Sequence, residues 1–267
     1  MERLISGLIG IPIVLGIILY GHSLLFFIFV ASLVLLATQE YFSMITNAGK
    51  IVFPNEGLAL SFLLLVFYFF VPKYLGLIGI LIPFTLFITS FFRKNNADVA
   101  IDAIVYTLFG IFYIAGLGGY FLLIGKMEGG REMFVFILLL IWAGDSMAYY
   151  VGRKYGKSKP FKMISPNKTT AGAFANIIGT LITAALASIL FFDKVPLIHC
   201  LIVSFICGII GQCGDLQESL IKRSCKTKDS GNLIPGHGGV LDRIDSLLFA
   251  GPVFYCYYQF LLVIKYL

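Results

Sequence analysis

Nine apolar runs that we interpret as membrane spans dominate this chain of 267 residues. They lie near residues 5–21, 23–39, 57–71, 75–92, 102–125, 133–151, 171–192, 196–213 and 246–264. A helix needs about 20 apolar residues to cross a hydrocarbon core. Only 13% of the residues are charged, which excludes a water-soluble globule, where about a quarter are. The sequence predicts an all-α, polytopic integral membrane protein with about nine transmembrane helices; the short first turn leaves a re-entrant first pair as an alternative.

Lys and Arg are distributed unevenly among the connections between these runs. In a nine-span arrangement, 15 of the 20 fall at the N-terminus or after the second, fourth, sixth and eighth runs. Because cytoplasmic loops carry the excess of Lys and Arg, we expect a cytoplasmic N-terminus and an external C-terminus in the inner (cytoplasmic) membrane. This bias and attraction to anionic lipid account for the net charge of +6, so no nucleic-acid partner is expected.

Polar residues become dense only in the second half of the chain. We therefore expect residues 1–130 to form a transmembrane scaffold and residues 131–267 to form a catalytic region whose active site faces the cytoplasm. The five cysteines include no Cys-x-x-Cys spacing, so neither a zinc site nor a disulfide framework is indicated.

Residues 219–245 form the densest polar cluster, with five cationic side chains, three carboxylates, one His and four glycines. A helix that continues out of the eighth run would carry one polar stripe. The stripe comprises Asp215, Glu218, Ser219, Lys222 and Lys226. For this helix alone, an amphipathic helix with its charges in water is the simpler interpretation. The residues that follow favour a functional site.

A glycine-rich loop follows this predicted helix, and Lys228 and His237 accompany its glycines. Such a loop lets backbone N–H groups approach a phosphate closely, although a plain turn is the alternative. Asp242 and Asp245 then stand three residues apart at the start of the last run. Paired carboxylates suit Mg²⁺, which takes one or two of them together with substrate phosphates. Two solvated charges at the end of a span remain the alternative.

Asp145 is an ionisable residue inside the sixth run. Such a residue costs at least about 2.5 kcal/mol to insert, so it is a candidate site residue, with an exposed helix-end Asp as the alternative. The segment 152–158 resembles a Walker A loop, but its glycine spacing is one residue short, so we reject a nucleotide-binding P-loop. Ser165 and Lys168 precede the seventh run, where a Ser or Thr would cap a helix and Lys168 would meet an anion.

The segment 219–245 resembles, without a gap, the signature of the phosphatidate cytidylyltransferases, also called CDP-diacylglycerol synthases. The matching pattern is Ser219-x-Ile221-Lys222-Arg223-x4-Lys228-Asp229-x-Gly231-x2-Ile234-Pro235-x-His237-Gly238-Gly239-Val240-x-Asp242-Arg243-Ile244-Asp245. Asp145-Ser-x-Ala-Tyr149 and Ser165-Pro-x-Lys168-Thr169 are similar to a second block of that family. The family usually has Glu where this chain has Ala171.

The resemblance implies that CTP and phosphatidate give CDP-diacylglycerol and pyrophosphate in phospholipid biosynthesis. It implies Mg²⁺ as cofactor, a second cation being an open alternative, and it assigns metal binding to Asp215 and Asp242, with help from Asp145. The cations expected to hold the triphosphate and the lipid phosphate are Lys222, Arg223, Lys228, Arg243 and Lys168.

His237 would contact or protonate the leaving pyrophosphate, while Asp229 and Asp245 would either act directly or orient the cations. The remaining substrate-binding residues are Ser165, Ser219, Gly238 and Gly239. A CTP-dependent lipid kinase would share the membrane and the nucleotide, but the intact signature argues against it. An ion-coupled transporter would place its charges near the midplane and often shows inverted repeats, of which the sequence has no sign. The oligomeric state is open, with a homodimer as one alternative.

Overall fold

The computed structural model describes residues 2–93, 97–192, 195–233 and 238–264, of which 2–9, 97 and 98 are described by backbone alone. Within these ranges the regular structure is helical and includes no β-strand. The helices are α1 (Glu2–Tyr20), α2 (Ser23–Asn47), α3 (Pro54–Phe70), η1 (Pro72–Tyr74), α4 (Leu75–Phe92), α5 (Ala97–Gly110), η2 (Ile111–Gly116), α6 (Leu117–Gly125), α7 (Gly130–Tyr155), α8 (Thr170–Leu190), α9 (Leu197–Ser224) and α10 (Leu241–Val263).

Seven helices in the described part of the chain are long and apolar enough to cross a membrane. One of them, Val99–Gly125, combines most of α5 with η2 and α6, as the single run 102–125 predicts. Two shorter apolar helices, Gly10–Tyr20 and Pro54–Phe70, correspond to the first and third predicted spans. The prediction of an all-α multi-pass membrane protein with about nine spans is therefore confirmed.

The contacts within the chain divide it into two compact units. Unit 1 comprises Met1–Leu123 and Ser224–Arg243, and unit 2 comprises Ile124–Arg223 and Ile244–Leu267. Unit 1 thus includes both the N-terminal helices and the glycine-rich loop. The division of labour that the sequence predicts, a scaffold in 1–130 and a catalytic region in 131–267, stays a prediction.

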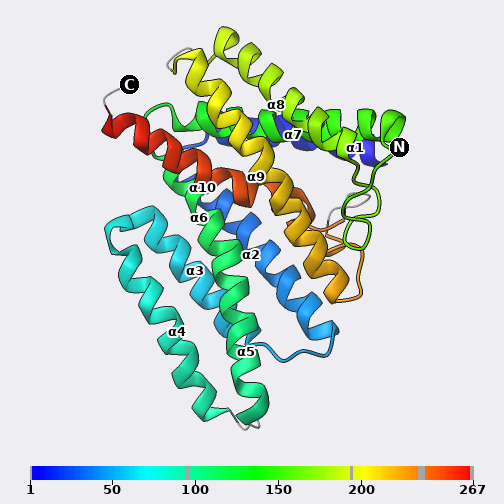
Figure 1. The fold of residues 1–267 in the computed structure, drawn as a ribbon. Helices are drawn as coiled ribbons and strands as arrows, with labels where there is room; N and C mark the ends of the chain where they lie inside the picture. The colour runs from blue at the N-terminus through cyan, green and yellow to red at the C-terminus, as the bar shows by residue number, and fades with distance from the viewer. Residues whose placement is uncertain (1, 94–96, 193–194, 234–237, 265–267) are drawn as a thin grey trace. The chain divides into compact units, whose positions relative to one another are not determined.

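In unit 1, α2, α3 and α4 lie side by side (Figure 1). Tyr41 and Phe42 of α2 are almost fully buried, and the Tyr41 hydroxyl donates to the Tyr106 carbonyl oxygen at 3.1 Å. The segment η2 is a π-helix, a geometry that breaks the regular ladder of backbone hydrogen bonds. At its end the Gly116 carbonyl accepts a hydrogen bond of 2.9 Å from the Tyr68 hydroxyl. These two tyrosine hydroxyls, which lipid would leave unsatisfied, are thus paired inside unit 1.

In unit 2, α7 packs along α8 over much of its length (Figure 1). The ring of Phe136 on α7 is fully buried and stacks on Phe192, with ring centroids 4.6 Å apart. Phe254 of α10 adds a third ring at 6.0 Å from Phe136. Aromatic pairs at such distances stabilise a core beyond the burial of their area, so this cluster fixes α7 against α10.

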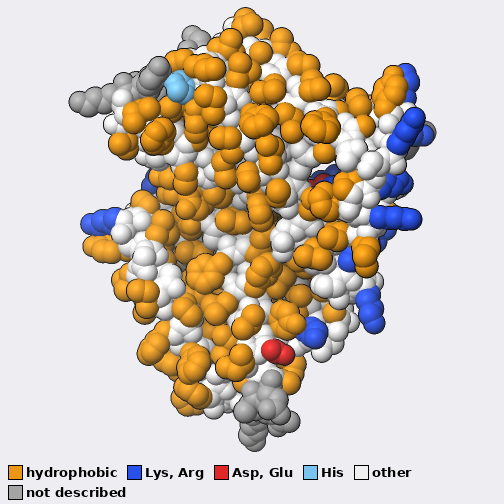
Figure 2. All heavy atoms as spheres, viewed as in Figure 1, with side chains coloured by type: hydrophobic (Ala, Val, Ile, Leu, Met, Phe, Trp, Pro, Cys, Tyr) orange, Lys and Arg blue, Asp and Glu red, His pale blue; other side chains and the backbone are white. Residues whose placement is uncertain are grey.

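Apolar side chains also cover the surface, as a lipid environment requires. Figure 2 shows hydrophobic side chains over most of the face in view, with few charges among them. On α8 five exposed large side chains recur at helical spacing along one stripe. They are Phe174, Ile178, Ile182, Leu186 and Ile189. In water such a stripe would be a liability, whereas in a bilayer it is the lipid-facing surface.

Candidate active site

Helix α9 continues out of the eighth apolar run to Ser224, as the sequence predicts. Polar side chains on one face of this helix interact with one another. The Ser219 hydroxyl donates to the Asp215 carboxylate at 3.4 Å, and Lys222 forms an ion pair with the fully buried Glu218. Placing Lys226 on the same helical face is wrong. The helix ends two residues earlier, and Lys226 adopts a left-handed conformation with φ of 56°.

Three carboxylates of unit 2 that the sequence singles out interact with one another. Asp215 of α9 repels Asp145 of α7, and both repel Asp245 of α10. The Lys168 ammonium lies 2.7 Å from Asp215 and also attracts Asp145, while Lys222 attracts Asp245. Three helices therefore bring three acids and two cations into one electrostatic cluster. Such a concentration of charge inside a membrane protein is typical of a functional site.

A chain of amides that the sequence analysis missed supports this cluster. Asn176 of α8 is buried, and its amide nitrogen donates to the Asp145 carboxylate at 3.2 Å. Gln212 of α9 in turn donates to the Asn176 amide oxygen at 3.2 Å and to the Gly208 carbonyl at 3.1 Å. The sequence does contain a sign of these two residues, because both amides lie within apolar runs, where a polar side chain needs a hydrogen-bond partner.

The connection between α7 and α8 carries the second predicted block. Lys168 lies in this connection, and its backbone N–H donates to the Ser165 carbonyl at 3.2 Å. Thr169 caps α8, because its hydroxyl accepts a hydrogen bond of 3.1 Å from the Gly172 N–H. Arg223 contacts the same connection by donating from Nε to the Ile164 carbonyl at 3.2 Å. Ala171 occupies the first turn of α8, which has no acidic residue.

The glycine-rich loop of unit 1 is organised around two carboxylates. Asp242, in the first turn of α10, accepts hydrogen bonds on Oδ2 from the Ser230 N–H at 3.0 Å and from the Gly239 N–H at 2.8 Å. The Ser230 hydroxyl lies 3.0 Å from the same oxygen and 2.9 Å from the Glu40 carboxylate of α2. Neither Ser230 nor Glu40 was a candidate in the sequence analysis, although Glu40 directly follows an apolar run.

The remaining predicted residues belong to unit 1 and to the start of α10. Lys228, Asp229 and Arg243 are solvent-exposed, Gly238 has a φ of +80°, and His237 lies outside the described residues. Asp215 belongs to unit 2 and Asp242 to unit 1, so their joint binding of a metal ion stays a prediction.

The side chains of unit 2 suit a hard cation. The carboxylates of Asp145, Asp215 and Asp245 interact with one another and have oxygen atoms that could act as metal ligands. Their mutual repulsion would fall if a divalent cation bound. Among the described residues, no group of three or more His, Cys, Asp or Glu side chains is arranged to hold a metal ion. A site with one or two carboxylates, completed by substrate phosphates, fits this arrangement, as is usual for Mg²⁺.

Comparison with known proteins shows to which protein family the chain is related. The model of the cytidylyltransferase family matches residues 1–261. The chain belongs to the cytidylyltransferase family. Relatives named phosphatidate cytidylyltransferase include those of Staphylococcus epidermidis, 30% identical with 94% of this chain and 96% of the relative covered, and Synechocystis, 30% identical with 98% and 97% covered.

The relative of Bacillus subtilis, also named phosphatidate cytidylyltransferase, is 38% identical over 155 residues. That match spans 58% of this chain and 58% of the relative. The chain therefore matches little more than half of the length of the Bacillus subtilis protein. Other matches, at 30% identity, extend over nearly all of both chains. The membership therefore concerns the whole described fold and not one segment of it.

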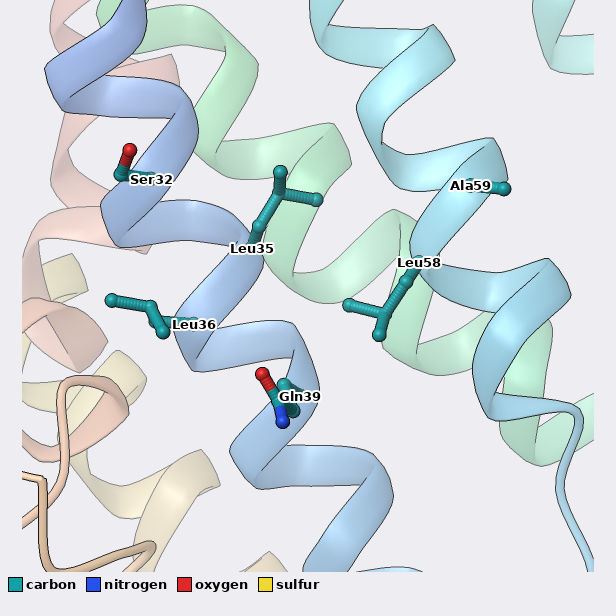
Figure 3. A pocket seen from close by; sticks show the side chains of 6 residues that line it. All are labelled: Ser32, Leu35, Leu36, Gln39, Leu58 and Ala59. Carbon is teal, nitrogen blue, oxygen red and sulfur yellow. The ribbon is translucent and has the colours of Figure 1, made fainter.

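A groove of about 540 Å³ opens between α2 and α3 of this family member. Figure 3 shows its six lining residues, which are Ser32, Leu35, Leu36 and Gln39 of α2 and Leu58 and Ala59 of α3. None of the six carries a charge, so the groove does not suit nucleotide phosphates.

Proposed function

We propose that this family member is a phosphatidate cytidylyltransferase, which transfers CMP from CTP to phosphatidate and gives CDP-diacylglycerol and pyrophosphate. The observation that carries the proposal is the family match over residues 1–261, which includes the signature segment 219–245 and the polar cluster of Asp145, Asp215 and Asp245. Relatives that carry this name and align over nearly the full chain support it.

The residues of unit 2 suit this reaction. A phosphomonoester has its second pKa near 6, so phosphatidate is largely dianionic at neutral pH and needs no strong base. One of its oxygens forms a bond to the α-phosphorus of CTP, the bond from that phosphorus to the β-phosphate oxygen breaks, and pyrophosphate leaves. The main task of the protein is to neutralise charge and to hold the reactants in line. Lys168, Lys222 and Arg223 are the cations of unit 2 that we assign to the phosphates.

Mg²⁺ is part of the proposal. Bound there, it would neutralise phosphate charge during transfer. We assign Asp215 to it, with Asp145 and Asp245 as the neighbouring carboxylates that would complete or orient the site. The Lys168 ammonium now occupies one side of Asp215, so we infer that Lys168 turns to substrate phosphate when the metal binds. Asp242 remains the second predicted ligand, and a second cation remains an alternative.

The proposed orientation places the signature segment on the cytoplasmic side, where CTP is available, in a bacterial plasma membrane. Its support is the excess of Lys and Arg, 15 to 5, in alternate connections of the predicted spans. No nucleic-acid partner is expected, and a homodimer remains one alternative for the oligomeric state.

The test uses the full chain in phosphatidate-containing vesicles with Mg²⁺ and labelled CTP. We expect a lipid-soluble cytidine product, with pyrophosphate released only when phosphatidate is present, and poor replacement of CTP by ATP or GTP. Vesicles with diacylglycerol in place of phosphatidate are the control. Formation of phosphatidate from that diacylglycerol would overturn the proposal and make the protein a lipid kinase.

A further inference from the structure

The carboxylate of Glu40 lies at the centre of the glycine-rich loop, although Glu40 belongs to α2, some 190 residues earlier in the chain. Its side chain is buried, with 5% of the residue exposed. A buried charge must be paired or hydrogen-bonded to be tolerated. The partners of this carboxylate therefore show what it does.

Those partners are all donors, as a carboxylate requires. The Val240 N–H donates to Oε1 at 2.9 Å, and the Leu241 N–H donates to Oε2 at 2.9 Å. The Ser230 hydroxyl lies 2.9 Å from Oε2. Val240 and Leu241 are the residues at which α10 begins, so Glu40 satisfies backbone donors that a helix start leaves unpaired and places a negative charge where the helix dipole favours one.

Two signature glycines pack against this carboxylate. A Cβ atom at Gly231 would lie 2.5 Å from Glu40 Oε1, and one at Gly239 would lie 2.4 Å from Oε2. Both distances are far below van der Waals contact, so the loop approaches Glu40 this closely only because these positions lack a side chain. These two glycines belong to the loop that the sequence suggests as a phosphate cradle, and they fit around a side chain of the protein itself.

Glu40 is linked to Asp242 through one hydroxyl. The Ser230 oxygen lies 2.9 Å from Glu40 Oε2 and 3.0 Å from Asp242 Oδ2, and its single proton serves one of them at a time. The Ser230 N–H holds the same Asp242 oxygen. Glu40 thereby fixes both ends of the loop, at Ser230 and at Val240, and so fixes the direction in which Asp242 and its neighbour Arg243 leave the helix start.

We propose that Glu40 is a positioning residue of the cytidylyltransferase: it holds Ser230, Gly231 and residues 239–241 in the conformation that orients Asp242 and Arg243 for the reaction. The proposal rests on the proposed function for the meaning of that orientation, but not for the contacts. It also assigns to α2, in the half of the chain predicted to be a scaffold, a part in forming the signature segment.

The test compares Glu40→Gln with wild type in the full chain. The amide keeps the size of the side chain but turns one acceptor into a donor, so one of the Val240 and Leu241 N–H groups loses its partner. We expect kcat for CDP-lipid formation to fall about 10- to 100-fold, a usual effect of losing a group that orients a site. We also expect faster hydrogen exchange in peptides covering residues 238–248, with exchange in α4 and α8 unchanged.

Glu56→Gln is the matched control, because Glu56 is also an acidic residue of unit 1 but forms its ion pair with Arg93. It should leave both kcat and exchange in 238–248 at wild-type values. Ser230→Ala is a milder variant that removes the shared hydroxyl and keeps the Glu40 charge. In Glu40→Gln combined with Ser230→Ala, the two losses should be clearly non-additive, since both act on one network.

Each result bears on the proposal. Normal turnover of Glu40→Gln would overturn it, and so would lost turnover with unchanged exchange in 238–248. Lost turnover with faster exchange throughout the helices, and with Ser230→Ala fully active, would show a merely structural role. A wild-type protein without cytidylyltransferase activity would refute the proposed function instead, and the exchange data would then decide alone whether Glu40 holds the loop.

Discussion

Replacing Asp215 by Asn separates its part in catalysis from its part in stability. The substitution keeps the shape of the side chain and removes one negative charge. Asp215 is paired with Lys168 at 2.7 Å, but it also repels Asp145 and Asp245. The ion pair is partly exposed, with 27% of the Lys168 side chain and 35% of the Asp215 side chain accessible, so it contributes no more than about 1 kcal/mol.

The loss of this pair is offset by relief of the repulsion from two carboxylates. We therefore expect the stability of Asp215→Asn to change by less than about 1 kcal/mol, the range of an exposed pair. Its effect on catalysis should be much larger. Losing one electrostatic contact to the reacting phosphates costs about 3–4 kcal/mol in the barrier, or about 10²–10³ in rate.

The assay measures CDP-lipid formation in vesicles and thermal unfolding in detergent on the same preparations. Asp102→Asn is the control, since Asp102 is an exposed acid on α5 and should be neutral in both measurements. Residual activity of Asp215→Asn should respond to higher Mg²⁺. Turnover close to that of wild type would refute the metal assignment and leave the family membership standing. If the free energy of unfolding fell by as much as the activation barrier rose, the electrostatic account of the cluster would be refuted.

Three further predictions follow from the same contacts. Asn176→Ala removes a buried amide together with its hydrogen bonds to Asp145 and Gln212, each of which contributes about 0.5–1.5 kcal/mol, so we expect a loss of about 1–3 kcal/mol in stability, measured by thermal unfolding; an unchanged melting temperature would contradict it. Lys168→Met should raise KM for CTP in steady-state kinetics but change the melting temperature little in thermal unfolding. An unchanged KM would remove Lys168 from the set of proposed phosphate-binding residues. An introduced Cys at Asn232 should react with a membrane-impermeant thiol reagent only from the cytoplasmic side, compared with the unmodified chain, and labelling only from outside would overturn the proposed orientation.

Much of the fold follows from hydropathy alone. Most apolar runs match a helix to within about five residues because, in lipid, a span must satisfy its own backbone and has few structures available. The run 23–39 is too short, since α2 continues to Asn47. The prediction that α9 would continue into the polar segment was confirmed, since a stripe of charges at helical spacing is a local pattern. Lys226 was misplaced because the end of a helix depends on one residue entering a left-handed conformation, which periodicity does not reveal.

The candidate site was only partly accessible from the sequence. Asp145, Asp215, Asp245 and Lys168 could be chosen because charges are conspicuous in apolar surroundings, and unit 2 does bring them together. Asn176 and Gln212 were overlooked because neutral amides are less conspicuous there. Glu40 was overlooked for a different reason. Its partners lie 190 to 201 positions away in the chain, a pairing that no local pattern encodes.

The start of α10 shows why the signature segment is rich in Lys and Arg. Backbone N–H groups at a helix start are a ready site for phosphate. Here the N–H of Gly239 donates to Asp242, and those of Val240 and Leu241 donate to Glu40. A phosphate would have to displace a buried carboxylate to use these donors, at the cost of leaving that charge unpaired. We therefore expect anion binding to fall to side chains, and the exposed Lys228 and Arg243 are the candidates in this segment for supplying the positive charge.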